Sequence, residues 1–210
     1  MEEVLDDLID KFWKNDRILE IHQLADEHRW GFTPRERFAE QPTALKAFRL
    51  FDGKRGKRIT GMMKPPLDKT GFHTRVYDYI YYGDGGKKKT TVIELQSDEL
   101  DLPAFHMKPK RGLARLFSRT GRKRTASDPD YFTTKYTIET SDPEAIEIQI
   151  PNSALNVISD CNGLSIEGEG NILLYYYYRK LIPVHEILHE YSTALKIMDR
   201  LLYDREKEFV

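Results

Sequence analysis

The sequence predicts an α+β fold, in which an antiparallel sheet from two hairpins and flanking strands is covered by helices and preceded by a helical N-terminal region. Three observations predict it: helical spacing of apolar residues in the first fifty positions, two strand pairs joined by glycine-rich turns, and a long amphipathic segment near the C-terminus. The 210 residues suit one domain with a helical extension. We therefore expect a helical region over 1–50 and an α+β domain over 51–210, together forming a single structural unit.

The first fifty residues carry three helix patterns. Residues 2–14 place apolar side chains at helical spacing between acids, and residues 17–29 do the same before Gly31. In "TPRE", Thr33 suits an N-cap, Pro34 the first helical position and Glu36 a capping box, which predicts a third helix that ends at Pro42. The apolar stripe of residues 2–14 also suits a protein partner or a second copy of the chain.

The strongest strand signal is "RVYDYIYYGDGGKKKTTVIEL", two runs rich in Val, Ile, Tyr and Thr around a glycine-rich turn. It predicts strands over 72–82 and 88–96. Strands over 57–64 and 103–108 would complete a meander, with prolines at the ends of the last one.

Beyond that sheet the patterns are mixed. The basic residues 110–129 lack a period and predict a loop, whereas "FTTKYTIET" predicts a strand. "SDPEAIEIQIPNSALNVIS" predicts two helical pieces that meet at Pro151, with Ser141 and Glu144 as a capping box. Its isoleucines also alternate as in a strand, which remains an alternative.

The last third predicts a second hairpin and a final helix. "LSIEGEGNILLYYYY" turns at Gly168 to Gly170, and the helix covers 183–205 after Pro183.

Several of these pieces resemble a family of uncharacterised bacterial proteins. The hairpin "VYDYIYYGDGGKKKTTVIEL" with the following "LPAFHMKP" is similar to that family's Asp-Tyr-x-Tyr strand, glycine-rich turn, basic return strand and Leu-Pro-x-Phe-x-x-x-Pro run. "LADEHRWGF", "DYFTTKYTIETSDPEAI" and "IEGEGNILLYYY" agree in order, so the resemblance spans about residues 20–178. It implies a shared fold and assigns no catalytic residue.

Composition indicates a cytoplasmic protein. The acidic start "MEEVLDDLID" is unlike a secretory signal, the longest apolar run is "NILLYYYY", and Cys161 is the single cysteine. The formal net charge of -1 hides a segregation, because residues 46–124 contain 20 Lys and Arg against 8 Asp and Glu. The remaining residues contain 13 Lys and Arg against 26 Asp and Glu.

Three basic clusters are the candidate binding residues, because clustered Lys and Arg neutralise phosphates. They suit a phosphate backbone or an anionic lipid, although charge runs are also ordinary solvated surface. The alternating Tyr77, Tyr79 and Tyr81 would either stack on bases or pack against the sheet. The clusters consist of Lys54, Arg55, Lys57 and Arg58; Lys87, Lys88 and Lys89; and Arg122, Lys123 and Arg124.

"HEILH" is the pattern of zinc peptidases, in which two histidines on one helix face share the metal. On a helix His185 and His189 would lie about 40° apart. Ser192 and Leu195 stand where a metzincin has glycine and its third histidine, and Glu206 would lie about 25 Å from His189 along the helix. A polar helix face explains the pattern equally well, so we expect no cofactor and keep zinc as an alternative.

No nucleophile, base and acid can be grouped from this sequence. The leading hypothesis is therefore a non-catalytic intracellular binding or scaffold domain. Binding of a phosphate backbone or anionic lipid through the basic clusters is the first alternative, and a zinc hydrolase using His185 and His189 is the second.

Overall fold

The computed structural model describes residues 16–67, 71–83, 85–110 and 131–204. The chain divides into two compact units. The first comprises the residues up to Ile93 together with Arg179–Ile187, and the second comprises Glu94–Tyr178 and the residues from Leu188 onward. The boundary expected at residue 50 lies inside the first unit.

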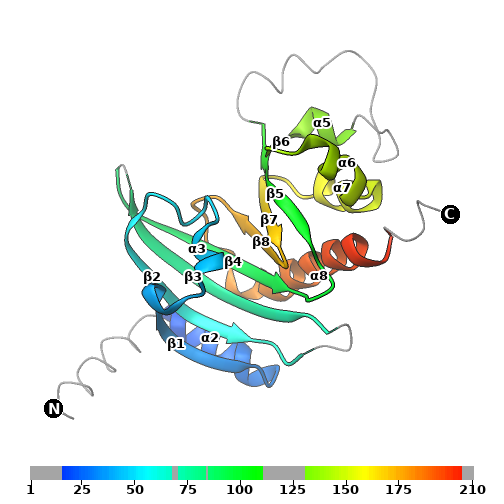
Figure 1. Cartoon of the computed structure of the whole chain (residues 1–210). Helices are drawn as coiled ribbons and strands as arrows, with labels where there is room; N and C mark the ends of the chain where they lie inside the picture. Colours follow the sequence, from blue (N-terminus) through cyan, green and yellow to red (C-terminus); the bar gives the residue numbers. More distant parts are fainter. Residues whose placement is uncertain (1–15, 68–70, 84, 111–130, 205–210) are drawn as a thin grey trace, which may run out of the picture. The chain divides into compact units, whose positions relative to one another are not determined.

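The first unit is an antiparallel sheet with strand order β1-β2-β3-β4 and a helix packed on it. Helix α2 lies along β1 and β2 (Figure 1) and buries Ile18, Ile21 and Ala25. The elements are α2 (Asp16–Glu27), β1 (Gly31–Arg37), the 3-10 turn η1 (Phe38–Glu40), α3 (Thr43–Lys46), β2 (Arg55–Lys64), β3 (His73–Gly83), β4 (Gly86–Gln96, of which the residues to Ile93 belong here) and the 3-10 turn η2 (Val184–Glu186).

The helix predicted from Thr33 to Pro42 is wrong, because this stretch begins with strand β1. Its backbone pairs with β2 from Gly31 opposite Lys64 to Arg37 opposite Arg58. A ladder of this length satisfies more backbone groups than one capping box does. Pro34 is tolerated because β1 ends the strand order and proline is compatible with an edge strand.

The second unit also combines antiparallel strands, in the order β8-β7-β5-β6, with helices. Helix α6 contacts β5, and α5 contacts α7. The elements are β5 (Leu102–Pro109), α5 (Tyr131–Lys135), β6 (Tyr136–Thr140), α6 (Pro143–Gln149), α7 (Asn152–Asp160), β7 (Leu164–Gly170), β8 (Ile172–Tyr177) and α8 (Ile187–Tyr203, of which the residues from Leu188 belong here).

The α+β fold is confirmed, as are both hairpins and the two helices that meet at Pro151. Three details differ. The N-cap of α6 is Asp142, whose carboxylate accepts a 2.9 Å hydrogen bond from the Ala145 N–H, and Ser141 does not take that place. "YFTTK" forms the short helix α5 before its strand begins, and the final helix opens with a 3-10 turn. The helix predicted over 2–14 and nearly all of the loop over 110–129 lie outside the described residues.

Within the described ranges, no helix combines the length and apolar character needed to cross a membrane.

Candidate functional site

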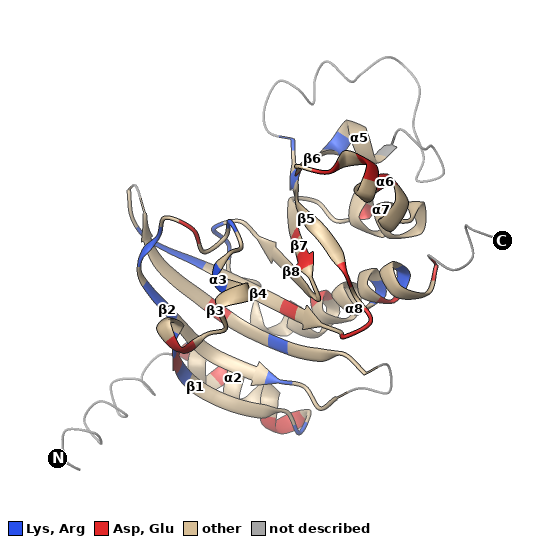
Figure 2. Ribbon diagram, in the orientation of Figure 1, with Lys and Arg blue, Asp and Glu red and all other residues tan. Residues whose placement is uncertain are grey.

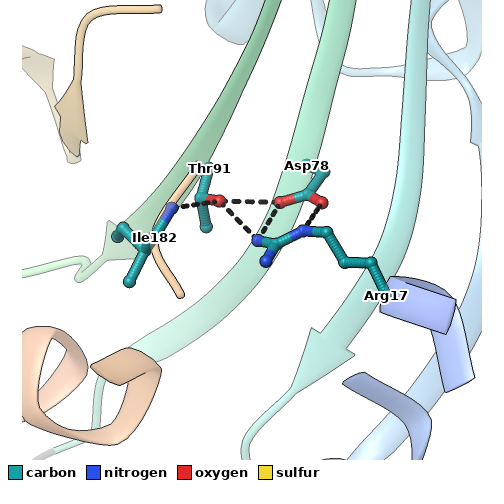
Figure 3. Close-up of polar contacts among 4 residues, drawn as sticks. All are labelled: Arg17, Asp78, Thr91 and Ile182. Atoms are coloured by element: carbon teal, nitrogen blue, oxygen red, sulfur yellow. Dashed lines mark hydrogen bonds and ion pairs between the residues drawn. The ribbon is translucent and has the colours of Figure 1, made fainter. Parts of the chain in front are cut away.

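A largely buried ion pair in the first unit joins α2 to β3 (Figure 3). The Arg17 guanidinium of α2 donates two hydrogen bonds to the Asp78 carboxylate of β3, from Nε at 2.6 Å and from a terminal nitrogen at 3.0 Å. Asp78 is only 5% exposed. A planar guanidinium facing a carboxylate in this way fixes geometry as well as charge.

Thr91 of β4 completes the arrangement. Its hydroxyl donates to Asp78 at 2.7 Å, and accepts from Arg17 at 2.9 Å and from the Ile182 N–H at 3.0 Å. A hydrogen bond between backbone groups, from the Thr91 N–H to the Lys180 carbonyl at 3.2 Å, also holds the segment after β8 against β4. The Asp78 carboxylate is therefore engaged in holding α2, two strands and a distant segment together.

The pairing of β2 with β3, which is irregular between Arg55 and Arg58, divides the first predicted basic cluster between the two faces of the sheet. Arg55 lies opposite Tyr82 and Arg58 opposite Ile80, so both arginines share the face on which Asp78 lies. Lys54 and Lys57 point to the other face. There the Lys57 ammonium lies 5.0 Å from the centre of the Phe38 ring, and the Lys54 ammonium 5.8 Å from that of Tyr81.

The second cluster is also divided between the two faces. Since Thr91 bonds to Asp78, counting back along both strands places Lys89 beside Ile80 and Lys87 beside Tyr82. Both lysines are exposed and lie on the face that carries Arg55 and Arg58. Lys88 points the other way and donates to the Gly85 carbonyl at 3.1 Å.

Arg37 joins this group, although no basic run in the sequence contains it. It is the last residue of β1 and lies directly opposite Arg58. Its side chain is 83% exposed and makes a loose contact of 3.8 Å with the Glu40 carboxylate. A strand prediction for "GFTPRER" would have placed Arg37 on this face, but the capping pattern at Thr33 favoured a helix.

We call the resulting surface the basic face: Arg37, Arg55, Arg58, Tyr82, Lys87 and Lys89. Figure 2 shows blue segments at the beginning of β2 and at the beginning of β4, which are the ends that this face occupies. Among the interactions of the described residues, none engages the side chain of Arg55, Arg58, Lys87 or Lys89 in a hydrogen bond or ion pair. Two predicted clusters thus contribute to a single surface.

One aromatic side chain lies within the basic face. Tyr82 is 47% exposed, and its ring rests on the backbone of Gly56. A Cβ atom at Gly56 would approach Tyr82 Cδ2 to 2.8 Å, and Gly56 has a φ of 57°. Glycine is thus favoured there for two reasons, its positive φ and the closeness of the Tyr82 ring.

The other hairpin tyrosines are core residues. Tyr77, Tyr79 and Tyr81 are each at most 1% exposed, so they pack within the first unit and present no stacking surface. Burial raises the pKa of Tyr79 well above its ordinary value, and the neighbouring Tyr81 adds to the shift. The third basic cluster, Arg122, Lys123 and Arg124, lies outside the described residues.

The two histidines of "HEILH" fall in different kinds of helix. His185 is in the 3-10 turn η2 and His189 in α8, so the continuous α-helical geometry expected for the pair is wrong. Both are exposed, and the His185 imidazole lies 3.7 Å from the carboxylate of its neighbour Glu186. The described residues hold no group of three or more His, Cys, Asp or Glu suited to a metal ion. The zinc site stays a prediction.

A second polar cluster, in the second unit, was missed by the sequence reasoning. Glu190 of α8 accepts hydrogen bonds from the hydroxyls of Tyr175 and Tyr177 on β8, the latter at 3.0 Å. Burial, and then the bond to Glu190, raise the pKa of Tyr175 far above its ordinary value. Burial, followed by the Glu190 charge, also raises the pKa of the Cys161 thiol to about 11. The Tyr175 hydroxyl and the Cys161 thiol therefore keep their protons at neutral pH.

Another polar network of the second unit, separate from the basic clusters, involves residues of four strands, β5 to β8. His106 of β5 lies opposite Glu139 of β6 and Glu167 of β7, with Nδ1 3.7 Å from the Glu139 carboxylate. Its Nε2 is 3.4 Å from the Tyr176 hydroxyl, which donates to Glu167. Lys108 donates to Glu139. Glu167 and Tyr176 are each 2% exposed, so this network serves mainly to neutralise buried polar groups.

Comparison with known proteins places the fold only. No family model matches the chain, and no curated protein matches it. The crystal structure of the mycobacterial trehalose monomycolate transport factor A, TtfA, is similar, with a TM-score of 0.54 over 89% of this chain and 94% of that chain. The sequence identity is 12%, so the likeness concerns the fold.

Proposed function

We propose that this chain is a non-catalytic binding domain that holds a negatively charged partner on the basic face. The observation that carries the proposal is that five cations, from β1, β2 and β4, lie on the same side of one sheet. Clustered Lys and Arg attract phosphate-bearing partners and raise the rate of encounter.

The spacing of these cations supports a ligand role. Arg37 and Arg58 lie directly opposite each other on paired strands, where like charges destabilise a sheet. Lys89 extends the row on β4, one strand beyond Ile80. An anion bound across the row would relieve this repulsion, so binding and stability of the first unit would be linked.

The hydrogen bonds of two acidic side chains support a role without catalysis. The Asp78 carboxylate is taken up by Arg17 and Thr91, and Glu190 by two tyrosine hydroxyls. Each thereby stabilises its own unit. The protein of similar fold is a trehalose monomycolate transport factor, and a role as a transport factor is extended to this chain as a proposal. Membership of the uncharacterised bacterial family, suggested by the sequence motifs, is proposed on the same footing.

A soluble polyanion tests this proposal. Inositol hexakisphosphate should raise the unfolding temperature of the wild-type chain, because a ligand of the folded state at 100 times its Kd adds about 2.7 kcal/mol to the free energy of unfolding. The variant Arg58→Glu/Lys89→Glu should lose the effect.

The matched control is Arg29→Glu/Lys196→Glu. It makes the same change of charge at exposed positions that do not belong to the basic face. Arg29 lies at the opposite end of β1 from Arg37, and Lys196 lies on α8 of the second unit. The control should keep the temperature rise. Equal stabilisation of all three proteins, or of none, would contradict the proposal.

A further inference from the structure

We infer that the basic face binds the surface of a lipid bilayer that contains anionic phospholipid. This inference rests on the proposed function, since it names the class of partner that the same face takes. Each Lys or Arg near such a surface adds a favourable electrostatic contribution that acts within about a Debye length. A membrane-facing surface therefore needs several cations that reach one plane.

The basic face has that arrangement. Arg37, Arg58 and Lys89 form one row across the strands, and Arg55 and Lys87 flank Tyr82 in the next row toward the turn. Four strands at a spacing of about 4.8 Å make the first row roughly 14 Å wide. Side chains that stand side by side on neighbouring strands present their charges over an area, as several lipid headgroups require, whereas a site for a single small anion needs donors that converge on one point.

Tyr82 adds the second property of a membrane-binding surface. Its ring is apolar and its hydroxyl polar, a combination that favours the boundary between headgroups and acyl chains. It is 47% exposed and lies within the cations of the basic face. Because Gly56 has no side chain, the ring lies close to the backbone of β2 and among the cations.

Single-stranded nucleic acid is the other phosphate-bearing partner, and it fits this face less well. Proteins that bind it combine a basic groove with aromatic rings on which successive bases stack. Here Tyr77, Tyr79 and Tyr81 are buried, and the basic face offers the ring of Tyr82. The observations therefore favour a bilayer, and binding of nucleic acid becomes an outcome of the test.

The test is sedimentation of the full chain with vesicles of phosphatidylcholine, with or without about one third phosphatidylglycerol, at low and at high salt. We expect binding to the anionic vesicles, loss of binding at high salt and no binding to phosphatidylcholine alone. Arg58→Glu/Lys89→Glu should bind the anionic vesicles about 30-fold more weakly or worse, because at least two favourable charges are removed. Arg29→Glu/Lys196→Glu should bind as the wild type does.

Tyr82→Ser separates a bilayer from a soluble polyanion. It should weaken vesicle binding several-fold and weaken stabilisation by inositol hexakisphosphate much less, because only the bilayer offers an apolar boundary to the ring. Circular dichroism would verify that each variant is folded, and Arg55→Gln/Lys87→Gln would replace the first double variant if that protein did not fold.

The outcomes are distinguishable. Stabilisation by the polyanion without vesicle binding, or with tight binding of single-stranded nucleic acid instead, overturns the bilayer inference and leaves the proposed function standing. Vesicle binding that survives the charge reversals, or that is equal with phosphatidylcholine alone, also overturns the inference. Failure with both polyanion and vesicles overturns the proposed function as well.

Discussion

The Asp78 carboxylate is almost fully buried and receives hydrogen bonds from Arg17 and Thr91. Removing one partner of a buried ion pair leaves the other charge without compensation, which is the costly part of such a change. Asp78→Ala should therefore lower the free energy of unfolding by about 3 kcal/mol, measured by urea denaturation. The double variant Arg17→Met/Asp78→Leu should recover much of this loss. A single-variant loss below about 1 kcal/mol would show that the Arg17–Asp78 pair does not hold α2 to the sheet.

Glu36 makes the stability of the first unit depend on pH in the acidic range. Burial by itself raises the pKa of Glu36, but hydrogen bonds from Lys64 and Gln41, together with the charges of Lys64 and Arg75, bring it below its ordinary value of 4.5. The Lys64 ammonium lies 3.0 Å from one carboxylate oxygen, and the Gln41 amide donates to the other at 3.0 Å. The folded chain thus favours the charged form of this side chain.

The direction of the pH effect follows from proton linkage. A carboxyl group whose pKa is lower in the folded state stabilises the fold fully above its unfolded pKa, and this stabilisation is lost as the pH falls through the lower folded pKa. The difference in unfolding free energy between wild type and Glu36→Gln should therefore be constant above about pH 6 and shrink below about pH 4.5. Urea denaturation across this range would measure it, and Lys64→Met should reduce the effect. A difference that grew on acidification would contradict the assignment.

At the scale of elements, the β1–β2 ladder decides where the cations of the basic face lie. Because Arg37 and Arg58 are direct partners, neutralising one of them should relieve repulsion. Arg58→Gln should raise the free energy of unfolding by about 0.5 kcal/mol at low ionic strength, and the gain should disappear near 1 M salt, where the screening length is about 3 Å.

Arg55→Gln is the control for that prediction, since Arg55 lies opposite Tyr82 and not opposite a cation. It should change stability little and show no dependence on salt. If both variants behaved alike, the register between β1 and β2 would not be the source of the effect.

The motif residues of the first hairpin serve the fold more than chemistry. Asp78 forms the central ion pair, and Tyr79 and Tyr81 are core side chains. In the second unit, the Phe105 ring of "LPAFHMKP" fills the space over Gly168, where a Cβ would come within 2.4 Å of it. Such glycine and aromatic pairs fix which residues of neighbouring strands face each other. Packing and hydrogen bonding within each unit therefore account for these motif residues.

For the whole molecule, charge is distributed unequally between the two units. Counted over the full sequence, the first unit has 20 Lys and Arg against 16 Asp and Glu, and the second has 13 against 18. The formal net charge of -1 therefore conceals units of opposite sign. Binding of an anionic surface depends on the local potential of the basic face, which the net charge does not report.

The sequence by itself determined the class of fold, because strand alternation, glycine turns and helical spacing are local signals. The strands predicted over 57–64, 72–82, 88–96 and 103–108 appear as β2 to β5 with small shifts at their ends. The helix cap at Thr33 is equally local, but it predicted the wrong structure, because Thr33 pairs with Met62 of β2, which is 29 positions away. Local propensity yields where a distant strand supplies more hydrogen bonds.

The composition of the candidate site was decided by tertiary structure. The sequence showed the runs that contain Arg55, Arg58, Lys87 and Lys89. Lys54, Lys57 and Lys88 point to the opposite face, because β4 alternates and β2 has an irregularity between Arg55 and Arg58. Arg37 belongs to the basic face only because the register of β1 on β2 places it opposite Arg58. Asp78 bonds to Arg17 only because α2 packs on the sheet. The physical reason is the same in each case: the residue types follow from the chain, whereas which of them share a face depends on pairing and packing between distant segments.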